Sequence, residues 1–242
     1  MSDRGLGLAD GVFETLLIRA GVPQLLKEHL QRWRDGAAWL QLPEPPNQQQ
    51  VEQWVSEAIG RSGITDGALR INWSRGSSGR GLQPPLQAKG RCWGSLYPHQ
   101  PGFERQQVVI SERVKRWAED PLNGCKTLDY SAMVLARLEA SQAGASDVLL
   151  RSSQGGLCCG SSANLLVQQG GQWLTPPLSS GALPGVMRAR GVAMGLIQEA
   201  RLAESLAEKQ PALLLNSLDC RPLNHIAEPL AEPLFGQLLG SD

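Results

Sequence analysis

The sequence lacks the features that mark membrane, secreted and nucleic-acid-binding proteins. No apolar run approaches the roughly 20 residues that a membrane-spanning helix needs. The N-terminus, Met-Ser-Asp-Arg-Gly-Leu, has no apolar core of the kind found in signal peptides. Lys and Arg together number 23, and so do Asp and Glu, so no charge excess points to nucleic acid or a membrane surface. We therefore expect neither nucleic acid nor a membrane among the partners.

Cysteine and histidine are too few, and wrongly spaced, for a disulfide framework or a zinc site. The chain has five cysteines, an odd number, and two of them, Cys158 and Cys159, are adjacent. The three histidines, His29, His99 and His225, do not lie near a cysteine pair in metal-ligand order. This pattern indicates reduced thiols and a cytoplasmic location.

What is present suits a globular protein of one large domain or two small ones, with 242 residues, 41% of them apolar and 19% charged. Alternating apolar residues and turn residues predict strands at 12–19, 23–26, 67–73, 92–97, 108–114, 147–150, 165–167, 173–175 and 212–215. Helical spacing predicts helices at 27–40, 51–61, 130–138, 191–206 and 229–239. The Pro- and Gly-rich segment after Tyr97 divides the chain into a small domain at 1–97, a linker at 98–104 and a larger domain at 105–242.

The stretch from Leu157 to Arg188 carries the first functional signal. Small residues begin it, and Ser179-Ser180-Gly181 then leads through Pro184-Gly185 into an apolar run with helical spacing. A Ser- and Gly-rich turn that opens a helix directs unpaired N–H groups at one point, which suits an anion and above all a phosphate.

Three segments together resemble the class IV, fold-type IV pyridoxal-phosphate (PLP) enzymes. These segments are Lys126-Thr-Leu-Asp-Tyr130, Ser162-Ala-Asn-Leu165 and Ser180-Gly-Ala-Leu-Pro-Gly-Val-Met-Arg188. The family includes branched-chain and D-amino-acid aminotransferases and 4-amino-4-deoxychorismate lyase. The resemblance implies a two-domain α+β fold like that of D-amino-acid aminotransferase, PLP in the interdomain cleft, a small-molecule substrate, and a homodimer. Relatives usually have one more strand before Asp3-Arg4, which we expect to be absent here or lost to a misplaced start.

The resemblance also implies which residues bind the cofactor. Lys126 is expected to hold PLP, and Tyr130 to hydrogen-bond the ring hydroxyl of PLP. Arg32, in the motif His29-Leu-Gln-Arg32, is expected to bind the phosphate, because its planar fork can make two bonds to phosphate oxygens. Without the resemblance, a surface lysine and a solvated basic helix face would explain Lys126 and Arg32 as well. Further phosphate contacts are expected from Val186, Met187, Ser217 and the backbone of Leu218.

One position departs from the family pattern. The family carries a Glu that pairs with the pyridine nitrogen of PLP, and Cys159 stands there in this chain. Because a thiol is a weak donor and cannot hold a pyridinium charge, the cofactor should be a weaker electron sink. We therefore expect a lyase, whose aromatic product supplies driving force, more than a transaminase.

Two further features favour the lyase branch. Thr15 stands where aminotransferases often have Gly, and its hydroxyl could position the substrate or assist proton transfer, although a β-branched residue in a strand needs no such role. Arg75 and Arg80 belong to a Gly- and Ser-rich loop and are assigned to the two substrate carboxylates. The alternative is a flexible surface loop whose charges are solvated. The other functions left open are a class IV aminotransferase and a degenerate protein that binds PLP or nothing.

Overall fold

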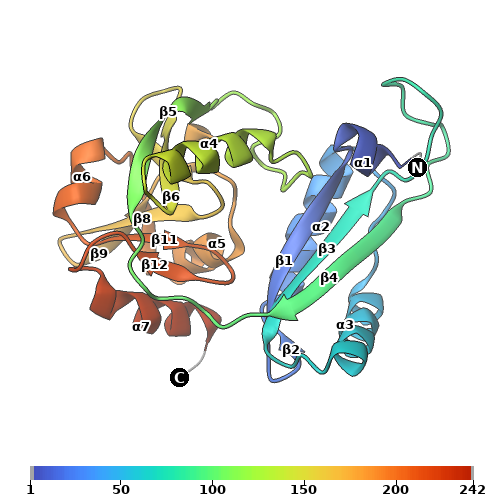
Figure 1. Cartoon of the computed structure of the whole chain (residues 1–242), viewed down its shortest axis with the longest axis horizontal. Helices are drawn as coiled ribbons and strands as arrows, with labels where there is room; N and C mark the ends of the chain where they lie inside the picture. The colour runs from blue at the N-terminus through green and yellow to red at the C-terminus, as the bar shows by residue number, and fades with distance from the viewer. Residues whose placement is uncertain (1–2, 241–242) are drawn as a thin grey trace. The chain divides into compact units, whose positions relative to one another are not determined.

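The computed structural model describes residues 3–240, and the chain divides into two compact units. The first unit is Met1–Gln100 together with Cys125–Asp129, and the second is Pro101–Gly124 together with Tyr130–Asp242. Each unit has its own sheet and its own covering helices, so each is described by itself (Figure 1).

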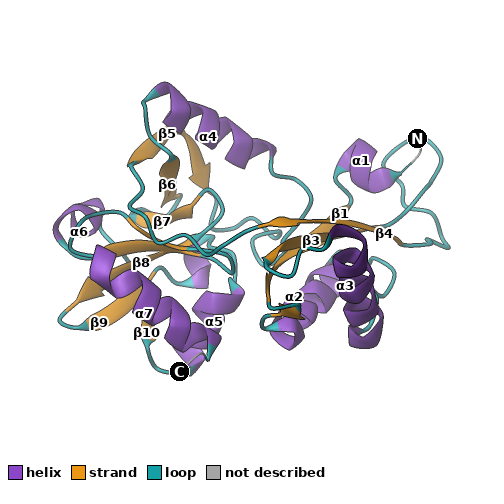
Figure 2. Ribbon diagram, turned by 60° about the horizontal axis from the view of Figure 1, so that its bottom comes forward, coloured by secondary structure: helices purple, strands orange, loops and turns teal. Residues whose placement is uncertain are grey.

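The first unit is a four-stranded antiparallel sheet with two helices on one face (Figure 2). Its sheet order is β2-β1-β3-β4. The strands are β1 (Gly11–Arg19), β2 (Val22–Pro23), β3 (Gly67–Ser74) and β4 (Arg91–Pro98), and the helices are α1 (Arg4–Leu8), α2 (Leu26–Trp39) and α3 (Gln48–Ser62). The core lies under α2 and α3, where Trp33 and Val51 pack against Leu16 and Ile71 of the sheet.

The two faces of β1 have different uses because side chains alternate along a strand. Val12, Leu16 and Ile18 belong to the core under α2 and α3. Phe13 and Thr15 therefore lie on the opposite face of the sheet. This division decides which polar groups of β1 meet the helices and which do not.

Cys125–Asp129 belongs to the first unit because it pairs with the start of β1. The N–H of Phe13 donates to the carbonyl of Lys126 at 2.9 Å, and the N–H of Leu128 donates to the carbonyl of Gly11 at 3.0 Å. Val12 and Thr127 stand opposite each other in this antiparallel bridge. The pairing holds Lys126 next to Phe13, on the face that α2 and α3 do not cover.

The second unit is built on an eight-stranded mixed sheet with the order β10-β9-β8-β7-β6-β5, in which β11 pairs with β8 and β12. The strands are β5 (Val108–Arg116), β6 (Asp147–Ser152), β7 (Leu157–Gly160), β8 (Asn164–Gln169), β9 (Gln172–Thr175), β10 (Ile197–Glu199), β11 (Ala212–Leu215) and β12 (Cys220–Pro222). The helices are α4 (Ser131–Gln142), η1 (Leu178–Ser180), α5 (Val186–Ala193), α6 (Glu204–Lys209) and α7 (Glu228–Leu239).

The helix predicted at 191–206 is wrong. Helix α5 ends at Ala193, and Gly195 follows with a φ of 72°, a left-handed conformation that stops a helix. Ile197 then joins β10, which runs parallel to β9 with Ile197 opposite Trp173. The apolar residues that suggested one long helix thus serve a short helix and a buried edge strand.

Three further findings concern membrane spans, metal ligands and cysteines. Over residues 3–240, no helix is long and apolar enough to cross a membrane. The same residues contain no group of three or more His, Cys, Asp or Glu side chains that could hold a metal ion. All five cysteines are free thiols.

Candidate active site

Lys126 lies beside a second cationic side chain in the first unit. Its Nζ is 4.4 Å from the centre of the Phe13 ring, and the guanidinium carbon of Arg70 is 3.7 Å from the centre of the same ring. Thr15 stands directly opposite Arg70 in the pairing of β1 with β3. Lys126, Thr15 and Arg70 therefore share one face of the sheet, which places an amine, a hydroxyl and a guanidinium close together.

Arg70 was missed from the sequence. Its strand reads Ala-Leu-Arg-Ile, and both Leu69 and Ile71 are buried. A charged side chain between two core residues must point to the other face of the strand. That alternation was the available signal, but without Lys126 on the same face nothing indicated a function.

Arg32 lies on α2 and pairs with a buried carboxylate of β1. Its Nε donates to Oε1 of Glu14 at 2.8 Å and its Nη2 donates to Oε2 at 2.6 Å. His29, one turn earlier on the same helix, meets Glu14 through Nδ1 at 2.7 Å. Burial alone would raise the pKa of Glu14, but the Arg32 charge and the His29 hydrogen bond outweigh it and lower the pKa to about 2. Burial lowers the pKa of His29, against the opposing effect of Glu14.

Arg75 has a different use from the one expected. It is buried, and its guanidinium forms a fork with Asp10, with Nε to Oδ2 at 2.8 Å and Nη2 to Oδ1 at 3.1 Å. The guanidinium also donates to the carbonyls of Gln41, from Nη1 at 2.6 Å, and of Leu40, from Nη2 at 2.8 Å. Burial alone would raise the pKa of Asp10, but hydrogen bonds from Arg75 and Arg4 outweigh it and lower the pKa. Arg75 thus joins the start of β1 to the end of α2, and its donors serve the protein.

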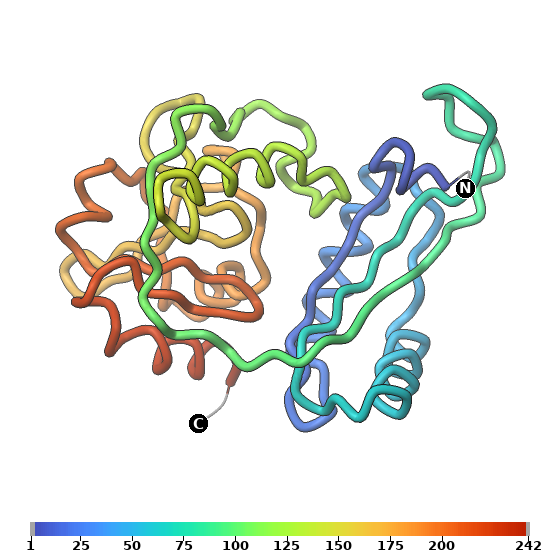
Figure 3. The backbone as a smooth tube through the Cα atoms, viewed as in Figure 1, coloured from blue at the N-terminus to red at the C-terminus, as the bar shows by residue number. Residues whose placement is uncertain are grey.

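Arg80 is exposed and belongs to the segment between β3 and β4. Figure 3 shows this segment as a long loop. Arg4 anchors this loop, since its Nη1 donates to Oγ of Ser78 at 3.1 Å and its Nη2 donates to the carbonyl of Leu82 at 2.9 Å. Arg80 therefore sits on a segment that is fixed on both sides, and its role toward a substrate carboxylate stays a prediction.

Cys159 lies in the second unit, in β7 opposite Asn164 of β8. It is buried, and its pKa is lowered by its interaction with the Cys158 thiol and by the charge of Arg116. The pKa of Cys158 is raised by its interaction with the Cys159 thiol and by burial, and its S–H donates to the carbonyl of Ser180 at 3.3 Å. The thiol pair therefore links β7 to the Ser- and Gly-rich turn that precedes α5.

Asp147, whose charge acts on Cys159, does not take the place of the Glu found in the family pattern. Asp147 forms an ion pair with Arg137 at 3.1 Å. Its Oδ1 accepts hydrogen bonds from the N–H groups of Val148 at 2.7 Å and Ser161 at 3.3 Å. These partners commit Asp147 to the fold of the β7–β8 region.

The predicted phosphate residues Val186 and Met187 form the first turn of α5. Its N-cap is Gly185, which has no side chain to bond the first N–H groups of the helix. A Cβ on Gly185 would lie 2.0 Å from Oδ1 of Asn164, whose Nδ2 donates to the carbonyl of Leu183 at 3.0 Å. Glycine is needed here because Asn164 approaches the backbone so closely, and the turn presents its N–H groups as an anion site requires.

The second expected phosphate segment needs a correction at Leu218. Its N–H donates to Oδ1 of Asn216 at 2.8 Å, and the N–H of Asp219 donates to the same oxygen at 2.9 Å. The backbone of Leu218 is thus used inside an Asx turn. Ser217, partly exposed in that turn, remains a phosphate candidate through its hydroxyl. Tyr130, also partly exposed, stands immediately before α4.

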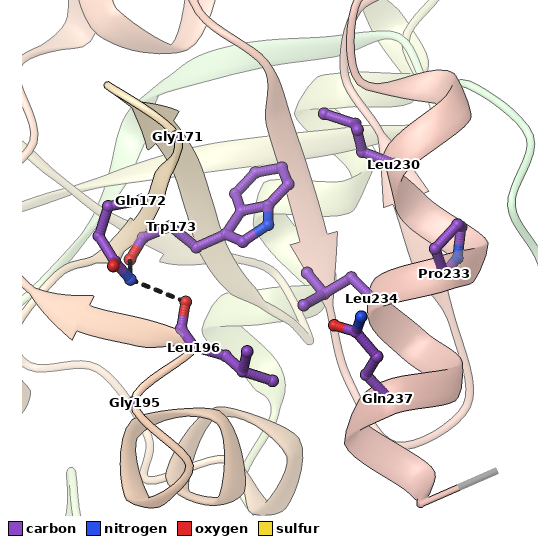
Figure 4. A pocket seen from close by; sticks show the side chains of 9 residues that line it. All are labelled: Gly171, Gln172, Trp173, Gly195, Leu196, Leu230, Pro233, Leu234 and Gln237. Carbon is purple, nitrogen blue, oxygen red and sulfur yellow. Dashed lines mark hydrogen bonds between the residues drawn. The ribbon is translucent and has the colours of Figure 1, made fainter. Parts of the chain in front are cut away.

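A pocket of about 320 Å³ in the second unit lies apart from these residues (Figure 4). Trp173 and Leu196 line it from the sheet side, and Leu230, Pro233 and Leu234 line it from α7. The Gln172 amide at its edge donates to the carbonyl of Leu196 at 2.9 Å. None of the site residues predicted from the sequence lines this pocket, so it is not the candidate active site.

Comparison with known proteins identifies the family. The model of the amino-transferase class IV family matches residues 11–226. The chain belongs to this family. Its members are PLP-dependent enzymes, so the chain is a PLP-dependent enzyme of the mixed α+β, class IV fold.

Individual relatives include both lyases and aminotransferases. The bifunctional aminodeoxychorismate lyase / D-amino acid transaminase of Mycobacterium tuberculosis is 31% identical over 187 residues, 69% of this chain and 62% of that protein. The crystal structure of 4-amino-4-deoxychorismate lyase from Pseudomonas aeruginosa is 27% identical, with a TM-score of 0.78, and the match covers 98% of this chain and 94% of that one. The branched-chain amino acid aminotransferase of Escherichia coli shares the fold at 19% identity, with a TM-score of 0.86 over 99% of this chain and 88% of that one.

Coverage limits what these relatives imply. The chain spans 65%, 62% and 55% of the length of the first curated relatives that it matches. The activities and substrates of those proteins are therefore carried to this chain only as proposals.

The chain carries side chains and backbone groups that suit the aldehyde and the phosphate of PLP. The amine of Lys126 suits the aldehyde. The guanidinium of Arg32 and the N–H groups in the first turn of α5 each suit a phosphate. Cys159 is the exception, because a thiol stands where the family pattern has a carboxylate.

Proposed function

We propose that the protein is a 4-amino-4-deoxychorismate lyase, which converts aminodeoxychorismate to 4-aminobenzoate and pyruvate for folate biosynthesis. The observation that carries the proposal is Cys159. A thiol occupies the position where the family pairs a carboxylate with the pyridine nitrogen, and the nearby carboxylate of Asp147 is bound to Arg137. Transamination depends most on a strongly electron-withdrawing ring. The lyase reaction depends on it less, because forming an aromatic product drives it.

We propose which residues of this chain would hold the cofactor. Lys126 binds PLP, Arg32, Val186, Met187 and Ser217 bind its phosphate, and Tyr130 contacts its ring hydroxyl. Bound there, PLP withdraws electrons from the carbon that carries the substrate amine. The protein supplies orientation and proton transfer. The Nζ of Lys126, freed when the substrate amine takes its place, would accept the proton from that carbon and return it to the methylene carbon of the departing enolpyruvate group.

We assign substrate recognition to two cationic side chains, Arg70 and Arg80. Aminodeoxychorismate carries two carboxylates, one on the ring and one on the enolpyruvyl ether. Arg70 shares the Phe13 ring with Lys126, so we assign Arg70 to one carboxylate in place of Arg75. Arg80 keeps its assignment to the other. Thr15 stands opposite Arg70 in the pairing of β1 with β3, and we assign its hydroxyl to orienting the substrate.

A class IV aminotransferase acting on branched-chain or D-amino acids is the second candidate. Relatives of this chain include branched-chain-amino-acid aminotransferases and a D-alanine aminotransferase. A homodimer in the cytoplasm is proposed on the family resemblance alone. Sedimentation analysis of the purified protein tests the dimer.

The two candidate functions are separated by offering both kinds of substrate to one preparation. One arm supplies enzymatically generated aminodeoxychorismate and measures 4-aminobenzoate by its fluorescence. The other supplies L- and D-amino acids with 2-oxoglutarate and measures glutamate. We expect product in the first arm and at most slow turnover in the second. Turnover in the second arm alone would assign the protein to the aminotransferases.

A further inference from the structure

Glu14 is a fully buried carboxylate on the face of β1 that packs against helices. Its neighbours on that face, Val12 and Leu16, belong to the hydrophobic core. Burying a charge in such surroundings is costly unless the charge is paired and hydrogen-bonded. Glu14 must therefore have a use that a core leucine could not fulfil.

Both partners of Glu14 come from one face of α2. His29 and Arg32 are three residues apart, so they point to the same side of the helix. Glu14 is ionised and can only accept hydrogen bonds, so the Nδ1 that meets it at 2.7 Å must carry the proton. His29 thus donates to Oε2, the oxygen that also accepts from Nη2 of Arg32, while Oε1 accepts from Nε.

This arrangement fixes the plane of the Arg32 guanidinium. Two parallel bonds hold the Nε–Nη2 edge against Glu14, and such a fork allows little rotation. An anion bound by Arg32 would approach from outside this fork. His29 in turn prevents Glu14 from rotating away from the fork.

We propose that Glu14 and His29 are positioning residues, which preset Arg32 for binding the cofactor phosphate. The proposal rests on the proposed function, in which Arg32 binds that phosphate. Glu14 and His29 act through Arg32 and touch neither cofactor nor substrate. They reduce the cost of ordering the arginine when the phosphate binds.

The test compares PLP with pyridoxal, which lacks the phosphate. Apoprotein is titrated with each compound, and the absorbance of the cofactor bound to Lys126 gives the dissociation constants. The variants are Glu14→Gln, His29→Leu and Arg32→Ala, with Asp35→Asn as the control, because Asp35 is an exposed carboxylate on the same helix. Circular dichroism and thermal unfolding check that each apoprotein is folded.

We expect Glu14→Gln to weaken PLP binding about tenfold, equivalent to about 1.4 kcal/mol, and His29→Leu to weaken it less. Pyridoxal binding should be unchanged in both variants, as should all binding to Asp35→Asn. Combining Glu14→Gln with Arg32→Ala should weaken PLP binding no more than Arg32→Ala alone, because Glu14 acts through Arg32. If Glu14→Gln does not fold, His29→Leu carries the same comparison.

Equal losses for PLP and pyridoxal, or additive losses in the double variant, would overturn the proposal and leave a structural role. If Arg32→Ala still bound PLP more tightly than pyridoxal by the wild-type ratio, the proposal would also be overturned, because Arg32 would then not bind the phosphate. A wild-type protein that binds neither compound would instead contradict the proposed function itself. The three failures are therefore distinguishable.

Discussion

Replacing Arg75 with alanine should destabilise the protein and leave the substrate KM unchanged. The substitution removes a fork to Asp10 and two bonds to the carbonyls of Leu40 and Gln41. Breaking a buried ion pair costs about 3–5 kcal/mol. Asp10 keeps one partner, Arg4, whose Nε lies 2.7 Å from Oδ2, so we place the loss at the lower limit, about 3 kcal/mol.

Urea denaturation followed by tryptophan fluorescence measures this loss, and steady-state kinetics on the folded variant measures KM. Arg75→Lys serves as the conservative comparison. It keeps the charge but cannot form the fork, so it should lose part of the same stability. The pKa of Asp10 is lowered, so the pair contributes at any pH above its ordinary pKa of 3.8 and weakens as pH falls below that value. The gap between wild type and Arg75→Ala should therefore be constant from about pH 5 to pH 8.

A fully stable Arg75→Ala variant with a KM raised tenfold or more would refute this reasoning. It would show that the Asp10 fork is incidental and that Arg75 binds substrate, as its place in the Gly- and Ser-rich loop first suggested. A gap that disappeared well above pH 5 would also count against the ionised pair.

Four other substitutions test neighbouring parts of the site. Arg70→Ala should raise the KM for aminodeoxychorismate about 10–100-fold, the loss of about 1.5–3 kcal/mol from one charge-assisted bond, and an unchanged KM would remove Arg70 from the substrate site. Arg80→Ala should raise KM without lowering the melting temperature, because its side chain is exposed. Cys159→Glu should increase transamination, measured as glutamate formed from 2-oxoglutarate, and good transamination by wild type would contradict the role given to the thiol. Gly185→Ala should weaken PLP binding in a spectral titration, because its Cβ would lie 2.0 Å from Oδ1 of Asn164.

The elements with clear local periodicity could be predicted from the sequence. The alternation in 12–19 and the helical spacing in 27–40 correspond closely to β1 and α2. The helix predicted at 191–206 failed because a period alone does not show whether a short apolar run is helix or buried strand. Gly195 marked the break, but its left-handed backbone and the pairing of Ile197 with β9 depend on tertiary context.

Some residues of the candidate site could likewise be predicted from the sequence, and others could not. Motif resemblance singled out Lys126 and Arg32, but it could not show that Lys126 pairs with β1, more than a hundred residues earlier. Glu14 could have been noticed, since alternation places it on the same face as Val12 and Leu16 and a carboxylate there needs partners. Arg75 could not have been assigned correctly, because its partner Asp10 lies 65 residues away and nothing local distinguishes a buried arginine from an exposed one.

The most direct test of the lyase assignment is the yield of both products from aminodeoxychorismate. Purified protein loaded with PLP is incubated with the substrate, and 4-aminobenzoate and pyruvate are quantified together, with Lys126→Ala as the control. The assignment predicts equal amounts of the two products from wild type and neither from the variant. Wild-type protein that shows the absorbance of bound cofactor yet releases neither product would contradict it.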